Sequence, residues 1–314
     1  MTKEELFLNV NQVEKIGSTS KLQRMLAHPL RYFHAILFRE LVYKRNKQEK
    51  EVVSTTFFDA TMNIFLPSST DIYLTGGKTH LSEIKLAKFL INTLNKGDLF
   101  LDIGAHYGYF SLLASSLVGK KGKVIAFEAS PVTFQMLNKN QARMANMTAY
   151  NHAISDSSQD LIFYEFPNLY SEYNTLDVSQ FENEAWFQKS PPTEITVKST
   201  ILDQFLKKEN RYPKVIKIDV EGAEFRVLNG AATYLKQSAP IIAMEYLSNE
   251  RGNESHVEAE KLLKSFGYTP HIINENGTLQ TINKINNYLS DNKLESDNIV
   301  FVKVKSDIPI PLNI

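Results

Sequence analysis

Apolar runs and helical patterns alternate over residues 98–153. Short apolar runs bounded by turn residues predict strands at 98–103, 123–128 and 147–153. Apolar residues at helical spacing predict helices at 108–118 and 131–145 between them. Successive parallel strands need a crossover helix, so this order predicts a parallel sheet with helices on both faces.

The same pattern resumes after a long interruption and completes the sheet. It adds, in order, strand 214–219, helix 223–235, strand 239–246, helix 256–266, and two tail strands at about 268–274 and 298–304. A polar, Asn-rich connection without a good helical pattern joins the tail strands, which fits a closing antiparallel hairpin. We therefore expect a doubly wound α/β fold with a mostly parallel seven-stranded sheet and an antiparallel C-terminal hairpin.

Residues 21–47 form a basic, aromatic segment with an amphipathic helical pattern. The segment has seven Lys or Arg residues and one acid, Glu40, and Pro29 suits the first position of a new helix. We expect its apolar face to pack on the main domain or on a second subunit, as in a homodimer; peripheral contact with anionic lipid is the alternative. The apolar positions recur at three- and four-residue steps: Leu22, Met25, Leu26, Leu30, Phe33, Leu37 and Leu41.

The N-terminal part of the chain lies outside the alternating pattern. Residues 1–20 are polar and weakly patterned, typical of a short tail or a loosely docked helix. Alternation predicts a β-hairpin from Val52 to Leu66, followed by a helix at 82–94 that leads into the sheet. We divide the chain into a tail with basic amphipathic helices (1–50), an accessory hairpin (51–80) and a main domain (81–314).

Composition narrows the function classes. Lys plus Arg and Asp plus Glu are both 35, so no bulk charge favours binding to nucleic acid. The chain has no Cys, which rules out disulfides, thiolate metal sites and a Cys nucleophile. Its start carries acids where a signal peptide would be basic, and no apolar run approaches roughly 20 residues. We expect a cytoplasmic protein, with association at the inner membrane face as the alternative.

The segment Phe100-Leu-Asp-Ile-Gly-Ala-His-Tyr-Gly-Tyr109 predicts a buried strand that runs into a glycine turn and opens a helix. Gly104 and Gly108 leave the backbone bare, so that a ligand can approach main-chain N–H groups. Asp102 stands at the end of this strand, and Glu128 ends the next strand 26 residues later. An acid at that place can accept the hydroxyl hydrogens of a ribose, which indicates a nucleoside cofactor.

The spacing of the glycines favours S-adenosylmethionine over a dinucleotide. A dinucleotide site has G-x-G-x-x-G, in which the second glycine lets the pyrophosphate touch the helix N-terminus. Here the spacing is Gly104-x-x-x-Gly108, with His106 at the centre. S-adenosylmethionine carries an ammonium, a sulfonium and a carboxylate, and Asp102 could orient its amino-acid end. The expected cofactor residues are Asp102, Gly104, Ala105, His106, Gly108, Tyr109, Glu128, Ala129, Ser130, Ala153, Ser155 and Asp219.

An ordered set of motifs supports this interpretation. The set is Asp102-Ile-Gly-Ala, Phe127-Glu-Ala-Ser-Pro131, Asn151-His-Ala-Ile-Ser-Asp156 and Ile216-Lys-Ile-Asp-Val-Glu-Gly-Ala-Glu224, followed by Leu228-x-Gly230. With these residues the chain resembles the FkbM family of methyltransferases over roughly residues 70 to 303. The family typically has Asn where His106 stands and often Pro where Ser130 stands. The resemblance implies a class I (Rossmann-like) methyltransferase fold, S-adenosylmethionine as cofactor and O-methylation, often of sugars or secondary metabolites.

Methyl transfer needs an acceptor oxygen held in line with the sulfur–carbon bond and relieved of its proton. Asp219 ends the fourth parallel strand, where ligands of such sheets bind, and ranks first for contact with the cofactor or the acceptor. Glu221 ranks second, as general base or acceptor orienter, and should be ionised near a helix N-terminus. His106 ranks third because imidazole titrates near neutrality. For Glu224 we expect a structural role in the first helical turn.

A divalent metal is an option that we do not predict. Asp219 and Glu245, near the end of the next strand, could offer oxygen ligands to magnesium. The sequence shows no further Asp or Asn in a recognisable ligand cluster around them, so metal ligands are not assigned.

The interruption at residues 167–200 is expected to be a loop on the acceptor side. Loops longer than about 15 residues in compact domains are usually functional or disordered. This one carries Tyr170, Tyr173, Trp186 and Phe187 among polar residues. Exposed aromatic rings suit stacking on a sugar, although any single ring is more readily explained as an anchor of the loop.

Several other functions remain open at this point. The acceptor could be a non-sugar secondary metabolite or a lipid-linked hydroxyl instead of a sugar. An NAD-dependent sugar oxidoreductase would need G-x-G-x-x-G and a Tyr-x-x-x-Lys pair, which the chain lacks. A base-methylating enzyme would carry Asn/Asp-Pro-Pro-Tyr/Phe where this chain has Asp219-Val-Glu-Gly222. A non-enzymatic module would bind the cofactor without turnover.

Overall fold

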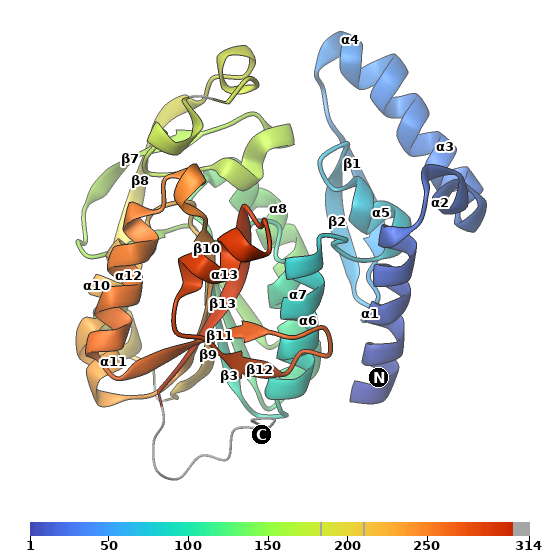
Figure 1. Ribbon diagram of the computed structural model, residues 1–314. Coiled ribbons are helices and arrows are strands. Elements are labelled where there is room, and N and C mark those ends of the chain that lie inside the picture. Colours follow the sequence, from blue (N-terminus) through green and yellow to red (C-terminus); the bar gives the residue numbers. More distant parts are fainter. Residues whose placement is uncertain (183, 210, 304–314) are drawn as a thin grey trace.

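The computed structural model describes residues 1–303 except 183 and 210 (Figure 1). The expected main domain therefore ends, at residues 304–314, outside the described residues. The last residue of the predicted strand 298–304 lies outside them as well.

The centre of the large sheet is parallel, as its sequence pattern predicts. Strand β3 (Leu99–Ile103) pairs in parallel with β4 (Lys123–Phe127) on one side and β9 (Pro213–Ile218) on the other. Strands β5 (Met147–Tyr150) and β10 (Ile241–Leu247) continue the parallel pairing outward. The chain order thus reverses between β3 and β9. Open α/β sheets bind their ligands at such a switch point, outside the carboxyl ends of the strands.

The C-terminal side of the sheet contains one strand more than expected. Strand β13 (Ser296–Lys303) lies antiparallel between β10 and β11 (Tyr268–Ile273), which confirms the antiparallel pair. Strand β12 (Leu279–Thr281) adds an eighth strand at the edge beside β11. The connection also contains helix α13 (Ile285–Asp291). The seven-strand count and the helix-free connection were wrong because these elements are too short to show a clear period.

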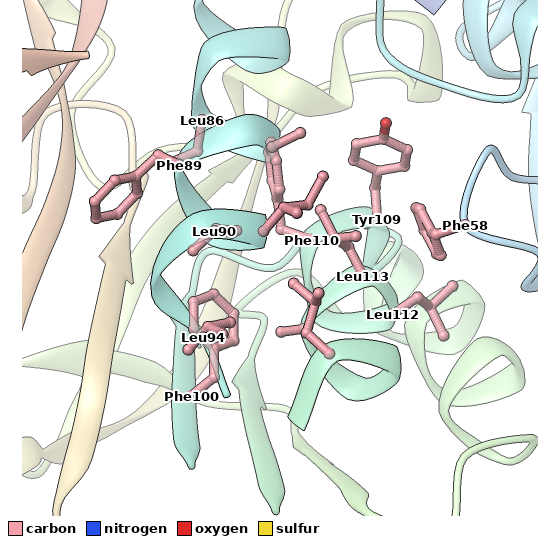
Figure 2. Close-up of a cluster of buried hydrophobic side chains, with 14 of the residues drawn as sticks. Phe58, Leu86, Phe89, Leu90, Leu94, Phe100, Tyr109, Phe110, Leu112 and Leu113 are labelled. Atoms are coloured by element: carbon pink, nitrogen blue, oxygen red, sulfur yellow. The ribbon is translucent and has the colours of Figure 1, made fainter. Parts of the chain in front are cut away.

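Helices cover both faces of the sheet, so two hydrophobic cores form. Neighbouring residues of β3 point to opposite faces, with Phe100 in one core and Leu101 in the other. Helices α6 (Leu81–Thr93) and α7 (Tyr109–Val118) cover the first face, and Figure 2 shows their side chains around Phe100. The opposite core contains the buried faces of α10 (Glu224–Asn229), α11 (Ala232–Gln237) and α12 (Glu254–Ser265). The doubly wound arrangement is confirmed.

Two helices differ from their predicted lengths for local reasons. Helix α8 (Pro131–Gln141) begins with Ser130, whose Oγ accepts the Thr133 N–H at 3.0 Å, and it ends before residue 145. The predicted helix 223–235 is split at Gly230. A Cβ there would lie 2.2 Å from the carbonyl oxygen of Ser155, so only glycine lets this helical segment approach the end of the neighbouring strand.

The first residues form a firmly packed helix and not a loose tail. Helix α1 (Lys3–Ser18) buries Leu6, Val10 and Val13 in the first core. The Lys88 ammonium of α6 lies 2.6 Å from the Glu14 carboxylate. Helix α1 therefore belongs to the body of the molecule. Its apolar stripe is too short to stand out among the polar residues of the sequence.

A helical arm, residues 21–46, follows α1 and lies beside the accessory hairpin (Figure 1). The expected new helix does begin at Pro29. Most of the arm's apolar face is exposed, so the expectation that it packs on the main domain is wrong. None of the described helices is both long and apolar enough to cross a bilayer. The elements are α2 (Lys21–Ala27), α3 (Pro29–Leu37), the π-helix η1 (Phe38–Tyr43), α4 (Lys44–Asn46), β1 (Lys50–Thr55), β2 (Thr61–Leu66) and α5 (Thr70–Thr75).

Part of the interruption is a second small sheet. Strands β6 (Ala153–Ser155), β7 (Asp160–Glu165) and β8 (Thr193–Ile201) pair in the order β6-β8-β7, and α9 (Leu202–Leu206) follows. Residues 193–200 are therefore strand and not loop. The remaining segment has short 3-10 turns, η2 (Asn168–Tyr173), η3 (Ser179–Phe181) and η4 (Phe187–Lys189), and a fourth, η5 (Asn249–Arg251), follows β10.

The aromatic rings of the interruption mostly stack on one another. The Trp186 ring stacks on both Tyr170, at a centroid distance of 4.6 Å, and Tyr173, at 5.0 Å. Phe166 packs edge-on against Trp186. These rings hold the segment together, which is the anchoring role and not an array of exposed rings for a sugar.

Candidate active site

A pocket of about 550 Å³ opens at the carboxyl ends of the central strands. Gly104, Glu128 and Asp219 directly follow β3, β4 and β9, and all three line it. Glu245, near the end of β10, lines it as well. Because these strands are parallel neighbours, residues far apart in the sequence meet at one edge of the sheet.

The glycine turn approaches the end of β9 very closely. Gly104 has φ +77°, and a Cβ there would lie 1.7 Å from the carbonyl oxygen of Asp219. Three non-glycine residues that line the pocket also have positive φ: His106 (50°), Glu221 (51°) and Lys293 (54°). Such strained backbone persists only where the surrounding structure enforces it, and it clusters at functional sites.

Glu128 presents a buried carboxylate that is held by the backbone. Its Oε2 accepts the His106 N–H at 2.9 Å, and its Oε1 accepts the Ser130 N–H at 3.0 Å. Burial raises the pKa of Glu128 to about 7, although these two donors favour the ionised form. Each oxygen keeps acceptor capacity for a further donor, such as a hydroxyl group.

Asp102 lies beneath the loop and does not line the pocket. Ser111 Oγ donates to Asp102 Oδ2 at 2.6 Å, and the Lys217 ammonium is 3.5 Å from Asp102 Oδ1. Lys217 also donates to Asp219 Oδ2 at 3.0 Å and to the Gly104 carbonyl at 3.4 Å. A buried lysine therefore joins the glycine loop to the end of β9. The sequence analysis did not single out Lys217, although a lysine inside an apolar strand was the signal.

Three carboxylates converge on the side of the pocket formed by β9 and β10. Asp219, Glu221 and Glu245 each offer an oxygen, and these oxygens lie within 4.8 Å of one another. Burial and the charge of Asp219 raise the pKa of Glu245 to about 8. Burial and the neighbouring acids also raise the pKa of Glu221 well above its ordinary value. The helix-terminus argument for an ionised Glu221 does not hold, because α10 begins only at Glu224 and Glu221 does not lie in the first turn of that helix.

Asp219 differs electrostatically from its two neighbours. Burial raises its pKa, but the ammonium groups of Lys217 and Lys78 outweigh burial and hold that pKa below its usual value. The cluster thus combines one carboxylate that stays ionised with two that hold protons readily. Carboxylate oxygens are ligands of magnesium, but the cluster alone is insufficient to assign a metal.

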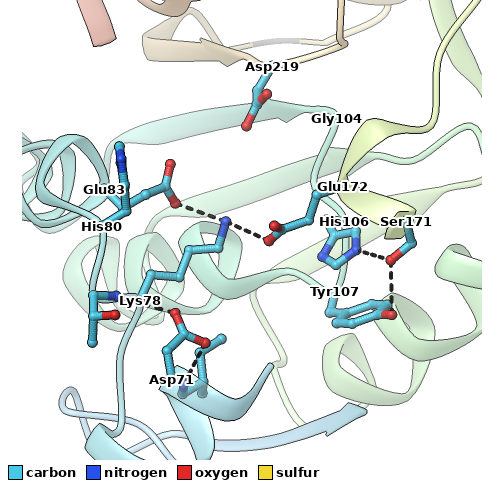
Figure 3. Close-up of polar contacts among 12 residues, drawn as sticks. Asp71, Lys78, His80, Glu83, Gly104, His106, Tyr107, Ser171, Glu172 and Asp219 are labelled. Atoms are coloured by element: carbon cyan, nitrogen blue, oxygen red, sulfur yellow. Dashed lines mark hydrogen bonds and ion pairs between the residues drawn. The ribbon is translucent and has the colours of Figure 1, made fainter. Parts of the chain in front are cut away.

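His106 is half-buried and packs against Ser171 and Tyr107 (Figure 3). Its Nε2 lies 2.8 Å from Ser171 Oγ, which in turn lies 3.2 Å from the Tyr107 hydroxyl. Burial lowers the pKa of His106 to about 4. The imidazole is therefore neutral at pH 7, and the premise that it titrates near neutrality was wrong.

Lys78, which precedes the first core strand, forms a wall of the pocket apart from the strand-end residues. Lys78 Nζ lies 2.9 Å from Glu83 and 3.3 Å from Glu172, as Figure 3 shows. Burial lowers the pKa of Lys78, but Glu83, Glu172 and Asp219 together raise it above its usual value. The sequence did not indicate this wall. Lys78, Glu83 and Glu172 lie on separate segments of the chain that only the fold brings together.

Glu224 has the structural role that was expected. It stands in the first turn of α10 and accepts the Val220 and Gly222 N–H groups, both at 3.3 Å. Its second oxygen lies 3.2 Å from His256 Nε2. These contacts tie α10 to the strand end and to α12.

The pocket gathers about half of the residues predicted for the site. Tyr109 packs in the core against Phe58, with ring centroids 5.7 Å apart (Figure 2), so side-chain contact with a bound cofactor is no longer expected. The predicted residues that line the pocket are Gly104, His106, Glu128, Ala129, Ala153, Asp219 and Glu221. Those outside its lining are Asp102, Ala105, Gly108, Tyr109, Ser130 and Ser155.

The lining of the pocket is predominantly acidic. Its described Lys and Arg residues are Lys78, Lys293 and Arg251, against eight acids. Even with Glu221 and Glu245 protonated, the other acids outnumber these three cations, which favours a cationic ligand and disfavours a pyrophosphate. The acids are Asp71, Glu83, Glu128, Glu172, Asp219, Glu221, Glu245 and Glu295.

Comparison with known proteins supports a methyltransferase. The family model of the methyltransferase FkbM domain matches residues 102–270. A hexuronic acid methyltransferase, AglP of Haloferax volcanii, is 27% identical over 165 residues. This match covers 52% of the present chain and 62% of that relative, so it spans less than two thirds of the relative's length.

Solved methyltransferase structures match this chain only at low similarity. An FkbM methyltransferase from Methylobacillus flagellatus has a TM-score of 0.40 and 12% identity, and the match covers 74% of this chain and 52% of that one. An S-adenosylmethionine-dependent O-methyltransferase from Thermotoga maritima has a TM-score of 0.40 and 14% identity, with coverage of 79% and 76%. These values carry no functional argument, and the fold assignment rests on the strand order described above.

Proposed function

Because this chain belongs to the FkbM methyltransferase family, we propose that it transfers a methyl group from S-adenosylmethionine to a hydroxyl oxygen of a sugar or glycan. The observation that carries the proposal is the acidic pocket at the switch point of the sheet, with Glu128 one strand away from the glycine turn. The family supports methyl transfer, and the pocket supports the choice of cofactor.

The residues present fit S-adenosylmethionine. Glu128 has acceptor capacity for the ribose hydroxyls, and Asp219 is ionised and can face a cationic group. An apolar side of the pocket offers space for adenine and consists of Phe127, Ala129, Ala153, Ile154 and Phe163. The excess of acids suits a sulfonium and an ammonium. It opposes the pyrophosphate of NAD, which argues against the sugar oxidoreductase.

The wall opposite β4 suits a polyhydroxyl acceptor. Lys78 and Glu83 place charged donor and acceptor groups at the pocket, and His80 and Arg251 line it as well. Sugar hydroxyls both donate and accept hydrogen bonds, so such a mixed wall can orient one of them. The similarity to AglP, a hexuronic acid methyltransferase, supports a saccharide acceptor.

The carboxylate cluster provides the proton acceptor that the reaction needs. When bound, the cofactor supplies a methyl carbon that is already activated by its sulfonium. Methyl transfer to an acceptor hydroxyl would release its proton, and a carboxylate of this cluster would accept that proton. We assign the proton to the ionised form of Glu221, because a raised pKa makes that carboxylate the stronger base. Asp219, held by Lys217, positions the reacting groups.

The proposal is tested first by binding and then by turnover. Calorimetry should show binding of S-adenosylmethionine and none of NAD, because the acidic pocket repels a pyrophosphate. Incubation with methyl-labelled cofactor and a panel of glycans should then give labelled sugar, with acid hydrolysis identifying an O-methyl group. Preferential binding of NAD would contradict the cofactor assignment. Cofactor binding with label transferred only to a non-sugar hydroxyl would contradict the acceptor assignment.

A further inference from the structure

One face of the helical arm is apolar and uncovered. Its helix runs without interruption from Pro29 to Asn46, through a π-helical turn, and is about 27 Å long at about 1.5 Å per residue. Spacings of three and four residues place a row of large side chains on one side. The exposed fractions are 86% for Leu30, 53% for Phe33, 54% for Leu37 and 58% for Leu41.

The opposite face of the same helix attaches the arm to the protein. Ala35 and Tyr43 are buried there, and Arg31 donates to the carbonyl oxygen of Tyr73 at 3.2 Å. His34 Nδ1 lies 3.2 Å from the Tyr73 hydroxyl. The arm is thus fixed on α5, and its apolar row is directed away from the protein.

The charge around the apolar row is almost entirely positive. Residues 21–47 contain seven Lys or Arg residues, and their one acid, Glu40, pairs with Lys44. A second copy of the chain would bring the same positive segment against itself, and like charges across an interface are unfavourable. An anionic bilayer matches both properties, since it accepts apolar side chains below phosphate groups that attract Lys and Arg.

The helical arm lies near one wall of the pocket, so membrane binding by the arm would bear on the proposed reaction. The arm packs on α5, and Asp71 of α5 lines the pocket wall beside Lys78. A membrane that binds the arm would therefore lie near the acceptor side of the active site. Lipid-carried acceptors are held at such a surface.

We propose that the helical arm binds the surface of an anionic lipid bilayer. Leu30, Phe33, Leu37 and Leu41 enter the boundary between headgroups and acyl chains, and the surrounding Lys and Arg residues contact lipid phosphates. The binding needs neither cofactor nor turnover, so it stands or falls independently of the proposed reaction.

Vesicle co-sedimentation of the full chain tests the proposal directly. Vesicles of phosphatidylcholine with 30% phosphatidylglycerol should bind the protein at low salt, and pure phosphatidylcholine vesicles should bind it much more weakly. Leu37→Gln should weaken binding about tenfold, because one large apolar side chain no longer enters the lipid. Lys44→Gln with Arg45→Gln should weaken it and reduce its dependence on salt.

A matched control distinguishes lipid binding by the helical arm from lipid binding by any exposed apolar side chain. Ile162 on β7 is 55% exposed, almost the same as Leu37. Strand β7 lies far from the helical arm (Figure 1). Ile162→Gln should bind vesicles like the unaltered protein. Circular dichroism of each variant before the assay shows that all are folded.

Three results would overturn the proposal. The first is failure to bind anionic vesicles, and the second is equal loss of binding in Leu37→Gln and Ile162→Gln. The third is a dimer, seen by sedimentation velocity, that Leu37→Gln dissociates while vesicle binding is absent. That result would assign the apolar row to an interface between two copies.

Discussion

The cofactor side of the pocket takes Gly104, Glu128 and Asp219 from positions directly after central strands, whereas the opposite wall takes Lys78 and Glu83 from the segment before the first core strand. The first group lies inside the region matched by the family model, residues 102–270, and the second lies outside it. The proposed cofactor contacts thus belong to the sheet that this chain shares with the family. The proposed acceptor wall depends in part on residues that precede the matched region, which makes those residues the natural place to determine specificity.

Gly104→Ala should have the largest effect on stability and on cofactor binding, because it disturbs the shared sheet itself. The added Cβ would lie 1.7 Å from the Asp219 carbonyl, so the loop or the end of β9 must move. We expect a loss of about 3 kcal/mol or more in the free energy of unfolding by urea, together with loss of cofactor binding. Gly97→Ala is the control, since Gly97 also has positive φ (96°) but has nothing within 4 Å. It should cost about 1 kcal/mol. Equal losses would contradict the close-contact argument.

Asp219→Asn should reduce kcat about 1000-fold and change stability much less. The variant keeps the shape of the side chain but removes the charge that Lys217 holds in place. Initial rates with saturating cofactor, together with the urea midpoint, separate the two effects. A rate like that of the unaltered enzyme would remove Asp219 from the reaction.

Glu128→Ala should weaken S-adenosylmethionine binding about 100-fold, because two hydroxyl groups lose a charged acceptor. Calorimetry measures the affinity. Glu209→Ala serves as the control, since Glu209 pairs with Lys123 and does not line the pocket. Unchanged affinity in Glu128→Ala would show that the ribose lies elsewhere.

Lys78→Met tests the other wall and should raise the acceptor KM about tenfold while leaving the cofactor Kd within about twofold. The reason is that Lys78 pairs directly with Glu83 and Glu172, whereas it acts on Asp219 only through its charge. Steady-state kinetics and calorimetry give the two numbers. A larger effect on the cofactor than on the acceptor would contradict the division into two sides.

The smallest effect concerns pH. The pKa of Glu245 is raised to about 8 in the folded protein, so its contribution to stability is full below its usual pKa of 4.5 and is lost as pH rises through 8. Glu245→Gln cannot ionise, so relative to the unaltered protein it should gain stability between pH 5 and pH 8.5. Urea unfolding without ligand at both values measures the gain. A constant difference would mean that Glu245 titrates normally.

Local pattern predicted the parallel part of the fold well. Each central strand is a short apolar run. Each crossover helix has apolar residues at three- and four-residue spacing, as expected for a helix that packs on the sheet. The pattern failed for α13, where only Ile285 and Leu289 are buried and too few turns exist to show a period. It also failed for residues 193–200, because a strand that pairs within a small second sheet depends on partners that the local sequence does not reveal.

The sequence by itself determined which residues end the central strands, and therefore that Gly104, Glu128 and Asp219 meet at one edge of the sheet. Only the tertiary structure decided what surrounds them: that Asp102 turns inward to Lys217, that Tyr109 joins the core, and that Lys78 forms the far wall. The physical reason is the distance along the chain over which each kind of interaction acts. Strand and helix periods arise from neighbours along the chain, whereas burial, charge and pKa arise from groups that the fold brings together across long stretches of sequence.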